Sequence, residues 1–318
     1  MSAWYRLSVA WQRLMHSSYE KNGVFMTEIL KAIIFGIVEG ITEWLPISST
    51  GHMILLNEFL TLDVSAQFWD MFLVVIQLGA ILAVVVLFWN LIWPFARSSS
   101  EAVVAAEQNE KSGSLVKREY WVLGPVTVRM PVIINWCKIV VSCLPAIVFV
   151  VLGLDETCDR LFYNPVCVAV ALIVFGVAFI LVENHNAAKQ ARVEQMRDIT
   201  FQMAILIGLF QLLAATFPGT IIGALLIGVS RKAASEFTFI LAIPVMLGAS
   251  LLKLMDFGLH LTGTEWAVLL SGMVSAFLVS VVVIKFLLGY IRKHDFKVFG
   301  WYRIWLGVVV LLYFFLLK

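Results

Sequence analysis

The sequence predicts an all-α integral membrane protein with six transmembrane helices and two re-entrant helical hairpins in an inverted repeat. Of its 318 residues, 61% are hydrophobic and only 14% are charged, whereas soluble domains carry about 25% charged residues. Six apolar runs are long enough to cross a bilayer, which takes about 20 helical residues. Two further regions consist of apolar pieces that are too short to cross.

The composition also excludes other classes of protein. Each polar stretch is shorter than about 40 residues, which is too short for a separate soluble domain. The formal net charge of +2 is too small to indicate a nucleic-acid partner. The four cysteines form no CxxC pair and are interpreted as small buried hydrophobic residues. We expect a single membrane domain over residues 26–318, preceded by an N-terminal extension over residues 1–25.

Each of the six apolar runs is interpreted as one transmembrane helix. The runs cover residues 71–93, 132–153, 164–182, 236–254, 266–290 and 299–317. Lysine and arginine concentrate in three connecting segments, over residues 94–131, 184–198 and 291–298. By the positive-inside rule these segments are cytoplasmic, which predicts a multi-pass protein of an inner membrane.

Two regions, residues 28–60 and 200–231, each hold two short apolar pieces. Such pieces cannot cross a bilayer alone, so each region is interpreted as a helical hairpin that enters and leaves on one side. Counting crossings from the cytoplasmic loops puts the first hairpin on the outer side and the second on the inner side. The two hairpins are therefore expected to approach each other near the middle of the membrane.

This arrangement predicts an inverted repeat with halves over residues 28–182 and 200–317, because each hairpin precedes three spans. A constant spacing of 172 residues separates three pairs of positions, namely Gly36 and Gly208, Glu39 and Gln211, and Pro46 and Pro218.

The first hairpin carries two carboxylates that point to chemistry. Glu39 and Glu43 are four residues apart, so they share one face of a helix. Such a pair is costly in an apolar medium unless a cation, a proton or a water-filled cavity accompanies it. We expect a divalent-metal or proton site. The alternative is a pair at the membrane surface that is neutralised or reaches water.

A run of hydroxyl side chains follows the carboxylates. Pro46 can end the first short helix, so that Ser48, Ser49 and Thr50 fall near the start of the second. A helix N-terminus offers free N–H groups and a positive dipole end, which suit a phosphate. His52 is the only one of the five histidines at membrane depth. The alternative for His52 is a core histidine that is bonded to a backbone carbonyl.

Four basic residues lie within or beside the spans. Each is assigned to a helix end, where a long side chain can extend to water. They are Lys138, Lys253, Lys285 and Arg303.

The segment from Glu39 to His52, Glu-Gly-Ile-Thr-Glu-Trp-Leu-Pro-Ile-Ser-Ser-Thr-Gly-His, resembles the first motif of the undecaprenyl-diphosphate phosphatase family, the bacitracin-resistance type. Three further segments are similar to that family, over residues 76–84, 228–237 and 293–303. The resemblance covers residues 26–318. It implies hydrolysis of undecaprenyl diphosphate to undecaprenyl phosphate in the bacterial inner (plasma) membrane. That reaction recycles the lipid carrier for cell-wall synthesis.

The resemblance also implies roles for individual residues. Glu39 and Glu43 would bind a divalent cation, Mg²⁺ or Ca²⁺, or handle protons. Ser49 or His52 would be the nucleophile or its partner, and we favour His52 because imidazole attacks phosphorus without prior activation. The residues assigned to substrate binding are Ser48, Thr50, Gly219 and Thr220.

The second hairpin departs from the family's pattern. In the family the motif runs Pro-Gly, one further residue, Ser-Arg-Ser and then Gly-Ala-Thr, whereas Thr220 leads directly into Ile221 here. The arginine of the motif is therefore missing, and a phosphoryl group loses a bidentate donor. Arg231 is a poor substitute because it lies roughly 16 Å further along a helix. We expect hydrolysis to be slow or absent.

Two other functions are considered. One is a non-catalytic lipid-diphosphate binder or flippase, and the other is a transporter, because inverted repeats with broken helices are typical of transporters. The expected partners are a polyprenyl diphosphate lipid and the membrane, with no nucleic acid. A homodimer is one of the assemblies considered.

Overall fold

The computed structural model describes residues 25–97, 120–123, 125–154, 157–158, 164–187, 189–216, 219–258 and 260–316. The predictions for the N-terminal extension up to residue 24 and for Pro218 lie outside this part of the chain.

Six helices in the described part are long and apolar enough to cross a membrane, which confirms the predicted spans. They are Ala66–Leu87, Met130–Val151 (α7), Pro165–Asn186 (α9), Arg231–Phe257 (α12), Gly263–Tyr290 (α13) and Lys297–Leu316 (α14). The first consists of α3 (Ala66–Val75) and α4 (Gln77–Leu87), which meet at Ile76. Large apolar side chains remain exposed along these helices, as lipid contact requires. The chain is a multi-pass membrane protein.

The first span differs from its predicted bounds of 71–93 at both ends. It begins at Ala66, where Ser65 accepts a hydrogen bond from the Phe68 N–H and caps the helix. It ends at Leu87, before the short helix α5 (Trp89–Ile92). The indole rings of Trp89 and Trp93 stack there with centroids 4.9 Å apart. Tryptophan is typical of the membrane–water interface, so these aromatic residues lie beyond the spanning part.

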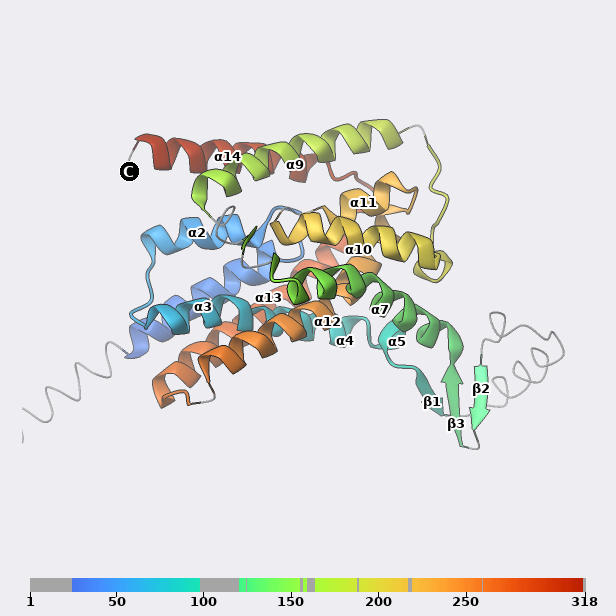
Figure 1. The fold of residues 1–318 in the computed structure, drawn as a ribbon, viewed down its shortest axis with the longest axis horizontal. Coiled ribbons are helices and arrows are strands. Elements are labelled where there is room, and N and C mark those ends of the chain that lie inside the picture. Colours follow the sequence, from blue (N-terminus) through green and yellow to red (C-terminus); the bar gives the residue numbers. More distant parts are fainter. Residues whose placement is uncertain are drawn as a thin grey trace, which may run out of the picture.

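The described part of the chain is mostly helical, as the all-α prediction requires, but the segment between α5 and α7 also contains strands. Three short strands lie there, β1 (Phe95–Arg97), β2 (Tyr120–Leu123) and β3 (Val126–Arg129). They form an antiparallel sheet in the order β1-β3-β2. Aromatic and β-branched residues supply these strands, and such residues favour a pleated surface. The sheet extends from one end of the bundle (Figure 1).

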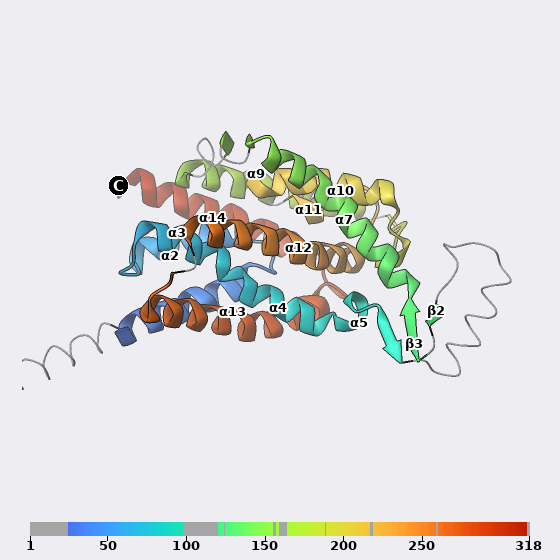
Figure 2. The same ribbon diagram turned by 60° about the horizontal axis from the view of Figure 1, so that its bottom comes forward.

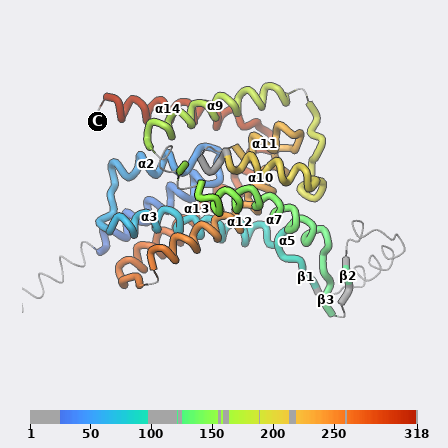
Figure 3. The backbone as a smooth tube through the Cα atoms, in the orientation of Figure 1, coloured from blue at the N-terminus to red at the C-terminus, as the bar shows by residue number. Residues whose placement is uncertain are grey.

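Two pairs of shorter helices interrupt the series of spans. The first pair is a helix over residues 25–42, followed by a turn and α2 (Ser49–Phe59). The second pair is α10 (Phe201–Thr216) and α11 (Thr220–Leu226), which follow the 3-10 turn η2 (Met196–Asp198). The tube in Figure 3 shows α2 toward the end of the molecule that carries the C-terminus, and α11 toward the end that carries the sheet.

Helices α9 and α14 pack side by side in both ribbon views (Figures 1 and 2). Glycines allow this close approach, because a Cβ on Gly300 would lie 2.8 Å from the Gly176 carbonyl oxygen. A Cβ on Gly307 would likewise lie 2.6 Å from the Ala169 carbonyl oxygen. Small residues of this kind bring membrane helices into backbone contact. The contact buries one face of α14, which includes Arg303 and Leu306, against α9.

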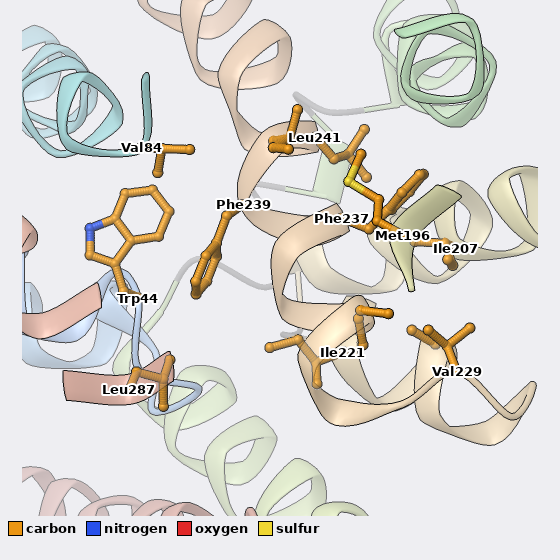
Figure 4. Packing of buried hydrophobic residues seen from close by; sticks show 14 of the residues in the cluster. Trp44, Val84, Met196, Ile207, Ile221, Val229, Phe237, Phe239, Leu241 and Leu287 are labelled. Carbon is orange, nitrogen blue, oxygen red and sulfur yellow. The ribbon is translucent and has the colours of Figure 1, made fainter. Parts of the chain in front are cut away.

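The tips of both helix pairs enter one buried cluster (Figure 4). Trp44, from the turn before α2, meets the ring of Phe239 on α12 edge to face, with centroids 5.1 Å apart. Ile221 of α11 belongs to the same cluster. Aromatic and aliphatic burial of this kind fixes each tip against the spans. The polar residues that adjoin Trp44 are therefore held inside the bundle.

Candidate active site

The two carboxylates of the first pair lie at the end of its first helix. The Glu43 N–H donates to the Glu39 carbonyl oxygen at 2.9 Å, so helical geometry continues just past residue 42. The two carboxyl groups interact with each other, as their spacing of four residues predicts. Glu39 is buried, and its Oε1 has no hydrogen-bond partner among the described residues.

The hydroxyl run falls at the start of α2, as predicted. Ser48 is the residue before α2, and its backbone has φ +74°, a conformation that non-glycine residues rarely adopt. Its side chain makes no capping hydrogen bond, so the first N–H groups of α2 receive no cap from Ser48. The Ser49 hydroxyl lies close enough to the Glu43 carboxyl group to interact with it. A carboxylate beside a serine hydroxyl can accept its proton.

His52 uses both ring nitrogens. Its Nδ1 lies 2.7 Å from the Ser48 carbonyl oxygen, which can only accept, so Nδ1 carries a proton in this contact. Its Nε2 lies 2.8 Å from the Tyr302 hydroxyl, and the two rings stack in parallel with centroids 5.6 Å apart. Tyr302 comes from α14, so the first helix pair and the last span meet at this histidine.

Arg303, the neighbour of Tyr302, corrects a prediction. Its side chain was expected to extend to water, yet the residue is fully buried. Its three guanidinium nitrogens have no hydrogen-bond partner in the described part of the chain. The guanidinium lies 5.7 Å from the centre of the Phe179 ring on α9 and close enough to His52 to interact with it electrostatically. The close contact of α9 and α14 turns this side chain inward.

Lys138 also departs from the prediction, whereas two other lysines do not contradict it. Lys138 is buried in α7, and its Nζ donates to the Arg197 carbonyl oxygen at 2.7 Å. This hydrogen bond holds the turn η2 against α7. Lys253 and Lys285 are exposed, and their extension toward water stays a prediction.

The second helix pair contributes fewer of the predicted contacts. Gly219 is the residue before α11, and Thr220 begins that helix as a buried residue. The structure gives no hydrogen bond between Thr220 and the first pair within the described residues. Arg231 is engaged elsewhere, since its Nε lies 2.9 Å from Oε1 of Glu183. That pairing is consistent with the expectation that Arg231 is a poor substitute for the missing arginine.

The structure thus brings Glu39, Glu43, Ser49 and His52 into one region and adds Tyr302 and Arg303. The roles of these two residues were missed in the sequence. A signal was present, because an arginine within an apolar span is a functional candidate by default. The fold and this cluster define a multi-pass membrane protein with a polar site of carboxylates, hydroxyls, an imidazole and a guanidinium, of which Glu39 and Arg303 are buried.

The chain belongs to the bacitracin resistance protein BacA family, whose sequence model matches residues 32–309. It is 56% identical to the undecaprenyl-diphosphatase of Desulfitobacterium hafniense over 295 residues, which cover 91% of this chain and 97% of that relative. It is 54% identical to undecaprenyl-diphosphatase 1 of Clostridium acetobutylicum, over 90% of this chain and 97% of that relative. An Enterococcus faecalis undecaprenyl-diphosphatase is 52% identical, over 90% of this chain and 96% of that relative.

Proposed function

We propose that this chain hydrolyses undecaprenyl diphosphate to undecaprenyl phosphate. Its family and the names of its relatives support this activity. The observation that carries the proposal is Arg303, a fully buried guanidinium without a partner among the described residues, beside His52. A buried unpaired cation is costly, so a site that keeps one is suited to an anionic ligand. A diphosphate at the end of a lipid supplies that anion from within the membrane.

The geometry supports Ser49 as the nucleophile. Its hydroxyl adjoins the Glu43 carboxylate, whereas Nε2 of His52 is hydrogen-bonded to Tyr302. In this proposal Ser49 Oγ attacks the terminal phosphorus while Glu43 takes its proton. The bond from that phosphorus to the bridging oxygen breaks, and undecaprenyl phosphate leaves. Water then cleaves the phosphoserine and releases inorganic phosphate. The assignment of His52 as nucleophile stays a prediction that the experiment below decides.

Two groups can stabilise the negative charge that develops during this attack. The N-terminus of α2, which Ser48 does not cap, presents backbone N–H groups beside Ser49. Arg303 supplies a full positive charge at a fully buried position, where such charges act most strongly. We propose that Arg303 partly replaces the arginine that is missing after Thr220.

We also propose that Glu39 and Glu43 hold a divalent cation, Mg²⁺ or Ca²⁺. The unpartnered Oε1 of buried Glu39 fits this role. No cluster of three or more His, Cys, Asp or Glu side chains occurs in the part of the chain that is described. Two carboxylates are nevertheless sufficient for Mg²⁺, which usually takes its other ligands from water and phosphate. When bound, the cation would neutralise phosphate charge.

The two helix pairs are proposed to be re-entrant hairpins of an inverted repeat, inserted from opposite faces. The packing supports this arrangement, because the first helix of each pair lies against the middle span of the other half. Gly36 faces α13 and Gly208 faces α7, and in both a Cβ would lie 2.2 Å from a facing carbonyl oxygen. In both, a serine of the span, Ser280 or Ser142, donates its hydroxyl to a carbonyl of that helix. The inner membrane is the proposed location.

The test is phosphate release from undecaprenyl diphosphate by the purified chain, with and without a chelator. We expect slow, chelator-sensitive release that Ser49→Ala abolishes. Glu39→Gln and Glu43→Gln should each weaken this metal-dependent release. His52→Ala should retain measurable turnover, and Ser49→Ala activity equal to the unchanged chain would reverse the nucleophile assignment. Uptake of a substrate into proteoliposomes without any phosphate release would favour the transporter alternative.

A further inference from the structure

A polar cavity lies at the end of the bundle where α9 and α13 end and α12 and α14 begin. Its volume is about 500 Å³. None of the residues of the candidate active site lines it. Its charged lining residues are Lys189, Arg192, Arg231, Lys232, Arg292 and Glu183.

The walls of this cavity are held in place by hydrogen bonds. The Arg192 N–H donates to the Gly228 carbonyl oxygen at 2.9 Å, and the Ser230 N–H donates to the Val193 carbonyl oxygen at 2.8 Å. Gly228 has φ +89°, and a Cβ there would lie 3.3 Å from the Arg192 side chain. Two loops that are far apart in the sequence are thereby joined, so the cavity is already formed without a ligand.

Some of the positive charge is neutralised within the wall itself. Buried Glu183 accepts hydrogen bonds from the Arg231 guanidinium and from a backbone N–H. Lys232 lies 3.8 Å from the Glu236 carboxylate, which also acts electrostatically on Arg292.

Two guanidinium groups remain available. Arg192 and Arg292 form no ion pair within 4.0 Å in the described part of the chain, and both are exposed at the cavity. They come from different loops, and both loops line the cavity. Guanidinium groups bind phosphate oxygens through paired N–H donors, more specifically than lysine does.

We propose that this cavity binds a phosphate group at the cytoplasmic end of the bundle, through Arg192 and Arg292. The ligand is either the headgroup of an anionic phospholipid of that leaflet or a soluble phosphate, which share this chemistry. Basic pockets between membrane helices on the cytoplasmic side are suited to anionic headgroups. The site is separate from the proposed catalytic site and does not depend on hydrolysis.

The test compares two double variants of the purified full chain. Arg192→Gln with Arg292→Gln removes the two free guanidinium groups of the cavity. Arg197→Gln with Lys293→Gln is the matched control, because it removes the same charge from exposed residues of the neighbouring loops that do not line the cavity. Binding of radiolabelled inorganic phosphate is measured by equilibrium dialysis. Binding of short-chain phosphatidylglycerol, against phosphatidylcholine, is measured by native mass spectrometry.

We expect the cavity variant to bind at least one probe about tenfold more weakly, as for a lost hydrogen bond to a charged group. The control should stay within about twofold, since exposed charges contribute little. A loss confined to phosphatidylglycerol identifies a lipid headgroup, and a loss confined to inorganic phosphate identifies a soluble ligand. Equal losses in both variants, binding that the cavity variant leaves unchanged, or no binding to the unchanged chain would each overturn the proposal.

Discussion

The Arg303→Met variant tests separately how Arg303 affects the stability of the fold and how it contributes to phosphate release. Arg303→Met keeps an unbranched, flexible side chain, although a shorter one, and removes the charge. The guanidinium is fully buried, and none of its nitrogens has a partner in the described residues. An unsatisfied buried polar group costs about 1–3 kcal/mol. We therefore expect Arg303→Met to raise the free energy of unfolding of the ligand-free chain by about that amount.

The same variant should lose phosphate release. Removing one preorganised donor that stabilises developing charge typically lowers kcat by about 10²–10³-fold. Because the arginine of the second motif is already missing, we expect the loss to reach at least this range. The assays are phosphate release under substrate saturation and thermal unfolding of the detergent-purified chain.

Arg231→Met provides the contrasting variant. Its guanidinium is paired with buried Glu183, so its removal leaves an uncompensated buried carboxylate. Breaking such a pair costs about 3 kcal/mol, and the variant should unfold at a lower temperature than the unchanged chain. If Arg303→Met were also less stable and still released phosphate at the original rate, Arg303 would be structural and the proposed role would be wrong.

Three further predictions concern packing, the missing motif and topology. Gly36→Ala should destabilise the chain by about 1–3 kcal/mol through overpacking. Gly248→Ala is the control and should not, because nothing lies within 4 Å of a Cβ at that position. Thermal unfolding compares the two variants, and equal midpoints would contradict the packing. Phosphate release should rise by about 10²-fold or more when Ser-Arg-Ser-Gly-Ala-Thr is inserted between Thr220 and Ile221. Alanine in place of the inserted arginine should largely cancel this increase. Equal rates before and after the insertion would refute the prediction. A cysteine at Gln190, in a cysteine-free background, should resist an impermeant thiol reagent in intact cells, and rapid labelling would reverse the orientation.

The sequence determined the features that depend on neighbouring residues. Hydropathy and length gave the six spans, because crossing a bilayer requires a continuous apolar helix. The spacing of Glu39 and Glu43 predicted their shared helix face, and the start of α2 at Ser49 followed from Pro46 and the hydroxyl run. The short strands before α7 were missed because a few β-branched residues in a loop give only a weak local signal.

Only the tertiary structure decided which face of each span is buried. Nothing local distinguishes Arg303, which is fully buried, from Lys285, which is exposed, since both lie in apolar helices. The inward direction of Arg303 follows from the close approach of α14 to Gly176 and Phe179 on α9. The contact between His52 and Tyr302 joins residues 250 positions apart. Hydropathy reports the environment of a segment, but the partner of a side chain depends on the rotation of the helix and on its neighbours, which packing alone fixes.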